Sequence, residues 1–423
     1  MPAVRPTTCR GSAVRARTGA VVAAVAAALL GLTACTSSTT PGASAAATTS
    51  SAAPTAATPT IEAAAAVLPF SQPATFTVRG GTIQSATVTG HLHGTVLPGH
   101  VGPDGSTWVS NQLPVPAATY DVRALVKDTT GHIHALVLSL RIAAVPNADK
   151  LFYSLTPYDG WTVGVNAPIV IRFEKPVQNK AAVEGALVVS STEPVTGSWH
   201  WVNSSEVHFR PQNPWPANSK VALAVNLAGV QAGPSLWGDS DQSILFTVGD
   251  RHVTTVDAVK DTFTVTDNGK LWAVWPTSLG RPQFATRSGN YVVLAKLPTL
   301  QMTSCSASIT CVKTNPNYYD LTVDWDVRLT YSGTFVHSAP WSVAAQGVDN
   351  VSHGCINLSP ARATAYFNFA RYGDLVTVTG TSRTAADLVA SGDPGMADWN
   401  VPWSTYTSAS ALGGQVTTTA LSG

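Results

Sequence analysis

The chain has 423 residues, of which 12% are charged, and its formal net charge is +1. This length exceeds what one ordinary hydrophobic core requires and indicates two to four domains. There is no basic run and no alternation of basic and aromatic residues, so we expect no nucleic-acid partner. After the N-terminus no uninterrupted apolar run approaches the roughly 18 residues of a membrane-spanning helix, which excludes a polytopic membrane protein.

Residues 1–35 have the features of a targeting segment. Arginines at positions 10, 15 and 17 precede a short apolar run, Gly19–Leu32. The run ends in Leu32-Thr33-Ala34-Cys35, which resembles a bacterial lipobox. We therefore predict a signal peptide whose removal exposes Cys35 for lipid attachment, so that acyl chains anchor the protein to the membrane. The alternative is an ordinary signal peptide cut near Ala34.

Residues 36–66 are predicted to form a flexible linker. They are mostly Ser, Thr, Ala, Pro and Gly, a composition that cannot bury a core. The linker would lift the folded part off the membrane, or serve as an inert spacer.

The region from residue 67 to residue 249 reads as two immunoglobulin-like β-sandwich modules, 67–148 and 149–249. Short alternating segments recur between Gly, Pro and Asn turns, which is typical of antiparallel sandwiches. A Cys–Trp–Cys pattern is absent, so the term describes architecture only. We expect the aromatic residues of the second module, such as Trp199, Trp201 and Trp215, to pack in its core. The predicted strands cover residues 74–79, 119–125, 134–140, 168–173, 198–202, 206–210 and 220–225.

Residues 250–380 are predicted to form a β-rich catalytic domain. Asn268-Gly269 favours a type I′ turn between strands at 263–266 and 270–274. Further strands are expected at 290–294, 320–327, 329–336 and 374–379.

One principal helix is predicted in this domain. Ser359-Pro360 has the residue types of an N-cap and a first helical position. The helix should run to about Arg371, bury Tyr366, Phe367 and Ala370, and end before Gly373. In the short C-terminal extension, 381–423, we expect Trp399 and Trp403 to pack against the body of the catalytic domain.

The candidate catalytic residues are His337 and, fifteen residues later, the segment Ser352-His353-Gly354-Cys355-Ile356-Asn357. A thiolate is the reactive form of cysteine, and a nearby imidazole can take the thiol proton or hold the thiolate as an ion pair. Gly354 permits a sharp turn that brings backbone N–H groups together. One such donor to an oxyanion is worth roughly 3–4 kcal/mol. The pattern predicts a cysteine acyl-transfer site.

The five cysteines support this interpretation. Cys9 lies in the predicted signal peptide, and Cys35 is the predicted lipid site. Cys305 and Cys311 lie six residues apart in a polar loop and can pair in an oxidising exported compartment. Cys355 is then left without a partner, as a nucleophile requires. A zinc site is the alternative, but the spacing matches no common zinc knuckle, so we expect no metal.

The string from His337 to Asn357 resembles the signature of the L,D-transpeptidases, whose catalytic domain is of the YkuD type. The resemblance covers roughly residues 251–380, and the domain order is similar to that of actinobacterial cell-wall lipoproteins of this family. It implies a mainly β fold and an enzyme without cofactors. The implied reaction is acyl transfer between peptidoglycan stem peptides with release of terminal D-alanine, giving a 3→3 cross-link.

The resemblance also implies roles for individual residues. Cys355 would be the nucleophile, His337 its base, and Ser338 the group that orients the imidazole. The N–H groups of Gly354 and Cys355, with His353, would form the oxyanion hole. We expect Asn357 to fix the loop through side-chain to backbone bonds. The residues expected at the substrate are Met302 and Tyr319 of a lid, Trp341 on the acceptor side, Ser352 and Asn357.

Two further expectations follow from the resemblance. Carbapenem-type β-lactams should react covalently with Cys355, and the protein should face the cell wall from the outer face of the membrane. The sequence departs from the family pattern at Arg287, where a proline is more usual. Two alternative functions remain: an L,D-carboxypeptidase or cysteine endopeptidase that uses water as acceptor, and a non-catalytic wall-binding lipoprotein.

Overall fold

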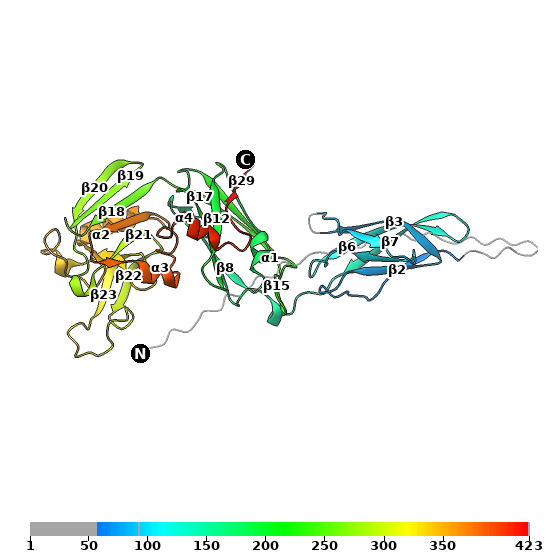
Figure 1. Ribbon diagram of the computed structural model, residues 1–423, viewed down its shortest axis with the longest axis horizontal. Helices are drawn as coiled ribbons and strands as arrows, with labels where there is room; N and C mark the ends of the chain where they lie inside the picture. Colours follow the sequence, from blue (N-terminus) through cyan, green and yellow to red (C-terminus); the bar gives the residue numbers. More distant parts are fainter. Residues whose placement is uncertain (1–56, 92–93, 422–423) are drawn as a thin grey trace, which may run out of the picture. The chain divides into compact units, whose positions relative to one another are not determined.

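The computed structural model of the protein describes residues 57–91 and 94–421. The predicted signal peptide, the lipid site at Cys35 and most of the predicted linker lie outside the described residues. The described part is mainly β, as predicted (Figure 1). Its buried apolar side chains form three hydrophobic clusters. Within the described residues, none of the helices is long and apolar enough to cross a membrane.

The first cluster lies between two antiparallel sheets, with strand orders β1-β2-β5-β4 and β3-β6-β7. The alternation of buried and exposed residues along β6 explains why the strand could be predicted from sequence. Phe76 and Trp108 stack in this core, with ring centroids 5.2 Å apart. The strands are β1 (Thr60–Ala63), β2 (Thr75–Arg79), β3 (Gly81–Gly90), β4 (Gly99–Val101), β5 (Thr107–Ser110), β6 (Thr119–Asp128) and β7 (Ile133–Arg141).

The second cluster lies between the sheets β28-β12-β13-β10-β8 and β29-β11-β14-β17-β9. Trp199, Trp201 and Trp215 are buried in it, which confirms their predicted core position. Its elements are η1 (Asn147–Asp149), β8 (Tyr153–Thr156), β9 (Thr162–Val163), β10 (Ile169–Phe173), α1 (Lys180–Gly185), β11 (Leu187–Ser191), β12 (Thr196–Trp201), β13 (Glu206–Pro211), β14 (Lys220–Asn226), β15 (Gln231–Gly233), β16 (Leu236–Trp237) and β17 (Asp241–Val248).

The third cluster holds together the β-rich part that follows, whose sheets have the orders β20-β19-β18-β26-β21-β27 and β22-β23-β24-β25. Asn268 and Gly269 have φ values of 49° and 79°, as a type I′ turn requires, so the predicted hairpin is confirmed. The elements are β18 (His252–Asp257), β19 (Thr262–Asp267), β20 (Lys270–Pro276), η2 (Pro282–Phe284), β21 (Arg287–Val292), β22 (Ala295–Thr303), β23 (Asp320–Arg328), β24 (Phe335–Ser338), η3 (Pro340–Ser342), β25 (Ile356–Leu358), α2 (Pro360–Phe369) and β26 (Leu375–Thr379).

Helix α2 is the predicted principal helix and packs against β23 and β24. Ser359 is its N-cap residue and Pro360 its first helical residue, but the Ser359 side chain makes no capping hydrogen bond. The helix ends at Phe369, two residues earlier than predicted, because Ala370 is already extended. Tyr366 and Ala370 are buried as expected, and Phe367 is partly buried.

The predicted strand at 329–336 is wrong over most of its length. Residues 330–334 form a turn, and β24 begins only at Phe335. The backbone N–H of Thr334 donates to the hydroxyl of Thr330 at 2.9 Å, and Gly333 has φ +105°. Local side-chain bonds therefore replace the ladder bonds that an apolar pattern favours.

The two tryptophans of the C-terminal extension do not pack as predicted. Trp399 and Trp403 lie on the second sandwich, where their rings flank the guanidinium of Arg210 at 4.7 and 4.9 Å. The expected packing against the catalytic domain is wrong because β28 and β29 extend the two sheets of the sandwich, and helix α4 lies beside β12 (Figure 1). The elements of the extension are β27 (Arg383–Thr384), α3 (Ala386–Ser391), α4 (Trp403–Ser408), β28 (Val416–Thr417) and β29 (Thr419–Ala420).

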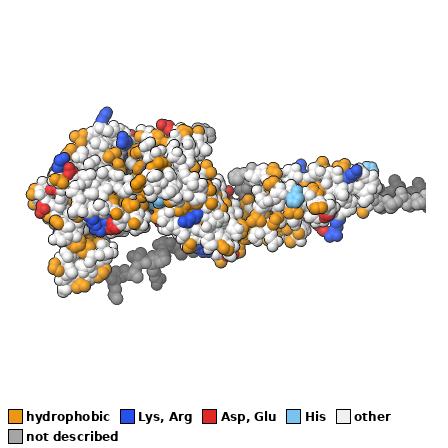
Figure 2. Space-filling view, in the orientation of Figure 1, with side chains coloured by type: hydrophobic (Ala, Val, Ile, Leu, Met, Phe, Trp, Pro, Cys, Tyr) orange, Lys and Arg blue, Asp and Glu red, His pale blue; other side chains and the backbone are white. Residues whose placement is uncertain are grey.

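The surface agrees with the low charge content of the sequence. Figure 2 shows Lys, Arg, Asp and Glu side chains sparsely scattered over the visible face, without a large patch of one sign.

Candidate active site

His337 and Cys355 come together because their strands are neighbours. Strand β24 carries His337 and pairs in parallel with β25, which begins directly after Cys355. In the register of this pair Val336 stands opposite Ile356, and His337 opposite Asn357. The residues between the two strands make the crossover that a parallel pair requires.

Both side chains line one cavity of about 240 Å³. All the residues predicted at the substrate lie around it: Met302, Tyr319, Trp341, Ser352 and Asn357, together with His353. Sequence reasoning missed three apolar lining residues, Leu321, Val323 and Val351, because nothing local distinguishes them from core positions.

A second cavity of about 680 Å³ is also lined by Cys355. It shares Tyr319, His353 and Cys355 with the first cavity, and Gly354 lines it as well. Cys355 therefore borders two cavities.

The thiol of Cys355 is neutral at pH 7. Burial raises its pKa to about 12, and the nearby carboxyl group of Asp326 adds to that increase. The sulfur donates a hydrogen bond to the carbonyl of Gly333 at 3.5 Å. Cys355 is the free cysteine of the described residues.

The imidazole of His337 is also neutral. Burial lowers its pKa to about 4, although a hydrogen bond to the backbone opposes this effect. Nδ1 lies 2.9 Å from the carbonyl oxygen of Ser338. Since a carbonyl only accepts, Nδ1 carries the proton and Nε2 is free to accept one. Ser338 thus orients the ring through its backbone rather than its hydroxyl.

The turn before Cys355 is fixed by Ser352. The Ser352 hydroxyl accepts a hydrogen bond from the Gly354 N–H at 3.0 Å and donates to the Cys355 carbonyl at 2.7 Å. Gly354 has φ +123°, a conformation that side chains disfavour. The Gly354 N–H that was predicted to face an oxyanion is therefore bonded to Ser352 in this structure.

His353 is held by Arg281, which the sequence did not single out. The Arg281 guanidinium lies 2.7 Å from Nε2 of His353 and donates to Asn317 at 2.6 Å. Guanidinium only donates, so Nε2 accepts and the other ring nitrogen carries the proton. Burial and the Arg281 charge lower the pKa of His353.

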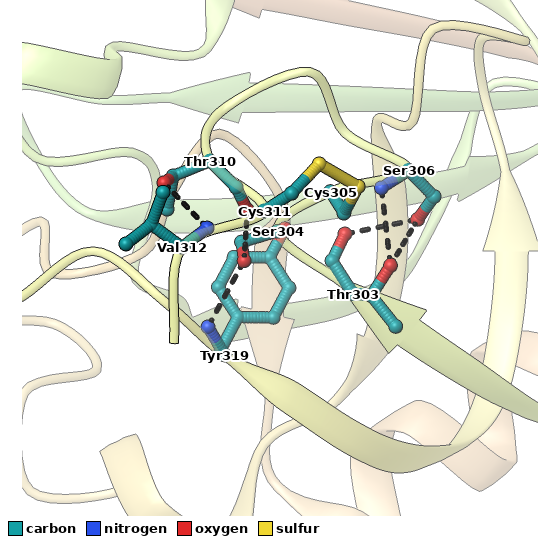
Figure 3. Close-up of a disulfide and its surroundings, with 8 residues drawn as sticks. All are labelled: Thr303, Ser304, Cys305, Ser306, Thr310, Cys311, Val312 and Tyr319. Atoms are coloured by element: carbon teal, nitrogen blue, oxygen red, sulfur yellow. Dashed lines mark hydrogen bonds between the residues drawn. A yellow bond between two sulfur atoms is a disulfide. The ribbon is translucent and has the colours of Figure 1, made fainter. Parts of the chain in front are cut away.

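The loop that bears Tyr319 is tied by a disulfide between Cys305 and Cys311 (Figure 3). Ser304 donates to the carbonyl of Thr310 at 2.8 Å and accepts from the Tyr319 N–H at 3.2 Å. These bonds link the disulfide loop to the start of β23. Burial and the neighbouring Cys355 raise the pKa of Tyr319 to about 12, so its hydroxyl stays protonated.

Three further residues named from the sequence lie near the site or beside it. Trp341 is 56% exposed, with its ring centroid 6.1 Å from that of His337. Asn357 donates to the side chain of Ser342 at 3.0 Å, so the expected side-chain to backbone bond is wrong. Arg287, at the departure from the family pattern, forms an ion pair with Asp387.

A zinc site that uses Cys305 and Cys311 is excluded because both sulfurs are in the disulfide. Elsewhere in the described part of the chain, Asp250, His252 and Asp267 lie close enough to share a metal ion. They line neither cavity at Cys355.

Comparison with known proteins agrees with this site. Residues 65–231 match a bacterial Ig domain, and residues 251–378 match the L,D-transpeptidase catalytic domain. L,D-transpeptidase 2 of Mycobacterium tuberculosis is 32% identical over 354 residues, which cover 84% of each chain. L,D-transpeptidase 1 of the same species is 37% identical over 247 residues, 57% of this chain and 91% of the relative.

Solved structures of similar chains include the L,D-transpeptidase LdtMt1 in complex with imipenem. It is 36% identical, with a TM-score of 0.48 over 55% of this chain and 99% of that chain. Another is L,D-transpeptidase 3 from Mycobacterium tuberculosis with a faropenem-derived adduct, 34% identical with a TM-score of 0.46, over 56% of this chain and 100% of that chain. From the match across most of the mycobacterial L,D-transpeptidase 2 and the shared catalytic domain, we conclude that this chain belongs to the L,D-transpeptidase family.

Proposed function

We propose that this L,D-transpeptidase forms 3→3 peptidoglycan cross-links through an acyl-enzyme on Cys355. The observation that supports this most directly is the convergence of Cys355 and His337, from adjacent parallel strands, in one cavity. The second cavity bordered by Cys355 adds support, because an acceptor stem must reach the thioester. L,D-transpeptidases act on the cell wall, so the enzyme works outside the cytoplasm.

In the proposed first step, the Cys355 sulfur attacks the carbonyl of the third stem residue, a diamino acid. Nε2 of His337 takes the thiol proton as the carbon–sulfur bond forms, since both groups are neutral beforehand. The tetrahedral intermediate then expels D-alanine, whose amine receives that proton. A thioester remains on Cys355.

In the second step, a side-chain amine of a neighbouring stem attacks the thioester. His337 takes the amine proton and returns it to the sulfur as the thiol leaves. The new amide is the cross-link, and no nucleotide energy is used. The amide bond to D-alanine is broken, and the cross-linking amide bond replaces it.

The turn at Ser352–Cys355 is the proposed oxyanion site. In our proposal the N–H groups of Gly354 and Cys355, with His353, hold the negative oxygen of each intermediate. For this the oxyanion has to replace the Ser352 hydroxyl at the Gly354 N–H. Arg281 keeps His353 in a fixed orientation.

Met302, Tyr319 and Trp341 are proposed to cover the substrate. All three line the cavity, and Tyr319 is fastened to the disulfide loop through Ser304. A cover matters because water that reaches the thioester hydrolyses it and turns the transfer into carboxypeptidase activity.

Defined tetrapeptide stems distinguish these outcomes. We expect the purified chain to release D-alanine and to form cross-linked dimers, which mass analysis of the products detects. The Cys355→Ala variant should keep its fold and give no turnover. Tripeptide without dimer would favour the hydrolytic alternative, and cross-linking by Cys355→Ala would contradict the nucleophile assignment.

We further propose the predicted organisation of the whole chain: a signal peptide with lipobox over 1–35 and a linker over 36–66. The modules would span 67–148 and 149–249, the catalytic domain 250–380 and the extension 381–423. The finer location is the outer face of the membrane, with lipid on Cys35. Labelling cells with a radioactive fatty acid tests it, because Cys35→Ala should lose the label.

Carbapenem-type β-lactams are the proposed covalent inhibitors. A β-lactam is a strained amide, and opening it by the Cys355 thiol would leave the ring carbonyl on sulfur as a thioester. The proposal rests on the same attack geometry as the first step above.

A further inference from the structure

Arg281 joins the loop of the proposed cover to the turn that precedes Cys355. Its Nη2 group donates to Oδ1 of Asn317 at 2.6 Å and lies 2.7 Å from Nε2 of His353, so each of its two hydrogens has an acceptor. Asn317 comes two positions before Tyr319 of the cover, and His353 comes two positions before Cys355. The guanidinium is therefore a bridge between the cover loop and that turn.

The backbone of Arg281 is fastened to the same turn, residues 352–355, which we call the thiol turn. Its N–H donates to the carbonyl of Ser352 at 2.9 Å. The preceding residue donates its N–H to the hydroxyl of Thr286 at 2.9 Å, and this hydroxyl donates to the carbonyl of Gly354 at 3.0 Å. Arg281 is thus held to the thiol turn by its backbone, and its side chain extends to the cover.

The imidazole of His353 is enclosed by aromatic rings. The centroids of the Phe284 and Tyr319 rings each lie 5.0 Å from that of His353. The Arg281 guanidinium lies 4.9 Å from the centroid of the Phe284 ring. Since Tyr319 belongs to the proposed cover, the position of the cover and the orientation of the imidazole depend on each other. His353 also lines both cavities that Cys355 borders, where a substrate would lie.

The bond to Arg281 also decides which nitrogen of His353 carries the proton. A neutral imidazole can carry it on either nitrogen. Because the guanidinium only donates, it selects the form with the proton on Nδ1. Burial and then the Arg281 charge lower the pKa of His353, so the ring is neutral at pH 7. The other titratable side chains of the first cavity, Tyr319, Cys355 and His337, are neutral at pH 7 as well.

We propose that Arg281 is a positioning residue, which holds the cover against the thiol turn and keeps the proton of His353 on Nδ1. The inference rests on the proposed function only for the place of His353 at the oxyanion. There the Nδ1–H group would donate to the negative oxygen beside the backbone N–H groups, and a donor that is oriented in advance acts most strongly. If the proton moved to Nε2, Nδ1 would become an acceptor and would repel the oxyanion. Arg281 itself gives up no proton in the reaction.

Acylation by imipenem at different pH values tests the choice of nitrogen. The full chain is treated between pH 5.5 and pH 8, and intact-mass spectrometry gives the rate. Arg281→Met removes the donors and the charge; at pH 8 we expect it to react roughly fivefold more slowly, because much of the His353 population then carries its proton on Nε2. The deficit should shrink towards pH 5.5, since the imidazolium forms near its ordinary pKa of about 6.5 and carries a proton on both nitrogens. His337 remains a base throughout, because burial lowers its pKa to about 4.

Acid does not repair a mere loss of packing. A deficit that is equal at pH 5.5 and pH 8, or no deficit at all, therefore overturns the role of Arg281 at His353. Arg281→Lys is the conservative variant: its ammonium group also only donates, and it should restore most of the wild-type rate at pH 8. Arg362→Met on helix α2 is the matched control, because Arg362 lines neither cavity at Cys355; it should behave like the wild type.

Hydrogen exchange of the full chain without any ligand tests the hold on the cover. Asn317→Ala removes the bond from Arg281 to the cover and leaves the bond to His353. In Asn317→Ala and in Arg281→Met we expect the amides of residues 317–319 to exchange about threefold faster than in the wild type, because the loop opens more often. Unchanged exchange in both variants overturns the hold on the cover. Asn317→Ala should also keep the wild-type dependence of acylation on pH.

Release of D-alanine from tetrapeptide stems separates this proposal from the proposed function. If exchange and acylation behave as expected but the wild type releases no D-alanine, the proposed function fails and the role of Arg281 stands. If the wild type releases D-alanine while Arg281→Met matches it in exchange and in acylation at every pH, the role of Arg281 fails alone.

Discussion

Cys355 and His337 reach the substrate as an uncharged pair. Burial raises the pKa of the thiol to about 12 and lowers that of the imidazole to about 4, so each shift opposes a resting thiolate–imidazolium pair. The Ser338 carbonyl fixes the protonated nitrogen of the ring and leaves Nε2 to act as the base. Proton transfer therefore accompanies attack.

The reaction with a carbapenem tests this pair directly. With imipenem as the probe, intact-mass spectrometry should show one adduct on the wild type, which peptide mapping places on Cys355. His337→Gln should lower the acylation rate by roughly 100-fold or more, because the thiol then has no base. Cys355→Ala is the control and should show no adduct there. An adduct elsewhere, or an unchanged rate in His337→Gln, would contradict the assigned roles.

Residues whose surroundings are created by the fold were the hardest to single out in the sequence. Arg281 lies 72 positions before His353 and contacts it only in the folded chain. Asp326 is one acid among several in its strand, and its complete burial arises only from the fold. Neither belongs to the string around Cys355, and no spacing rule connects them to it.

The proposed cover of the site consists of strands β22 and β23 and the disulfide loop between them. Figure 3 shows the disulfide loop. Met302 is on β22, opposite Leu321 of β23, and Tyr319 directly precedes β23. The disulfide closes a loop of only a few residues. The Ser304 hydroxyl is hydrogen-bonded both to this loop and to the backbone of Tyr319, so the loop helps to fix the position of Tyr319.

Removing the disulfide should loosen this cover. For Cys305→Ser combined with Cys311→Ser we expect the free energy of unfolding to fall by roughly 2 kcal/mol, as loop-closure entropy gives for so short a loop. Urea unfolding measures this. We also expect a larger share of hydrolysed tripeptide, because water reaches the thioester more easily. The wild type treated with a mild reductant should behave in the same way, and equal product ratios in both proteins would contradict the proposed cover.

Elements with strong local signals formed as predicted. The Asn268-Gly269 hairpin and helix α2 depend on backbone preferences of a few consecutive residues. The turn at 330–334 did not follow its apolar pattern, because the Thr330 hydroxyl satisfies the local backbone. Short helices such as α3 and α4 escaped detection since six residues show little periodicity.

Across the folded chain, the C-terminal extension is joined to the second sandwich by a buried ionic network. Nδ1 of His208 lies 2.9 Å from Asp398, and Nε2 lies 2.8 Å from Glu206. Tyr406 donates to the same oxygen of Asp398 at 3.1 Å. Although burial alone would lower it, these carboxylates raise the pKa of His208 to about 9.

The raised pKa fixes how stability depends on pH. The folded state binds the His208 proton more tightly than the unfolded chain does, so the stabilisation is complete below about pH 6.5. It is lost as the pH rises through about 9. Removing a partner of a buried charge costs about 3 kcal/mol or more.

We therefore expect Asp398→Asn to lower the free energy of unfolding by about 3 kcal/mol at pH 6. The difference from the wild type should shrink between pH 6.5 and pH 9, which thermal unfolding over this range measures. Asp387→Asn is the matched control, because that ion pair is half exposed and worth at most about 1 kcal/mol. A difference that grows with pH would refute the charged state of His208.

The sequence by itself determined the mainly β architecture, the hairpin, the principal helix and the residues of the Cys355 motif. These features depend on the alternation of apolar residues, on the residue types that turns favour and on a short sequence motif. All three are local in the sequence. The motif also led to the family to which the chain belongs.

Only the tertiary structure decided the protonation of Cys355 and His337 and the pairing of Arg281 with His353. It also decided the burial of Asp326 and the packing of the end of the extension on the second sandwich. Each of these depends on burial or on contacts between distant segments. A side chain's desolvation and its neighbours' charges exist only once strands from different parts of the chain have packed together.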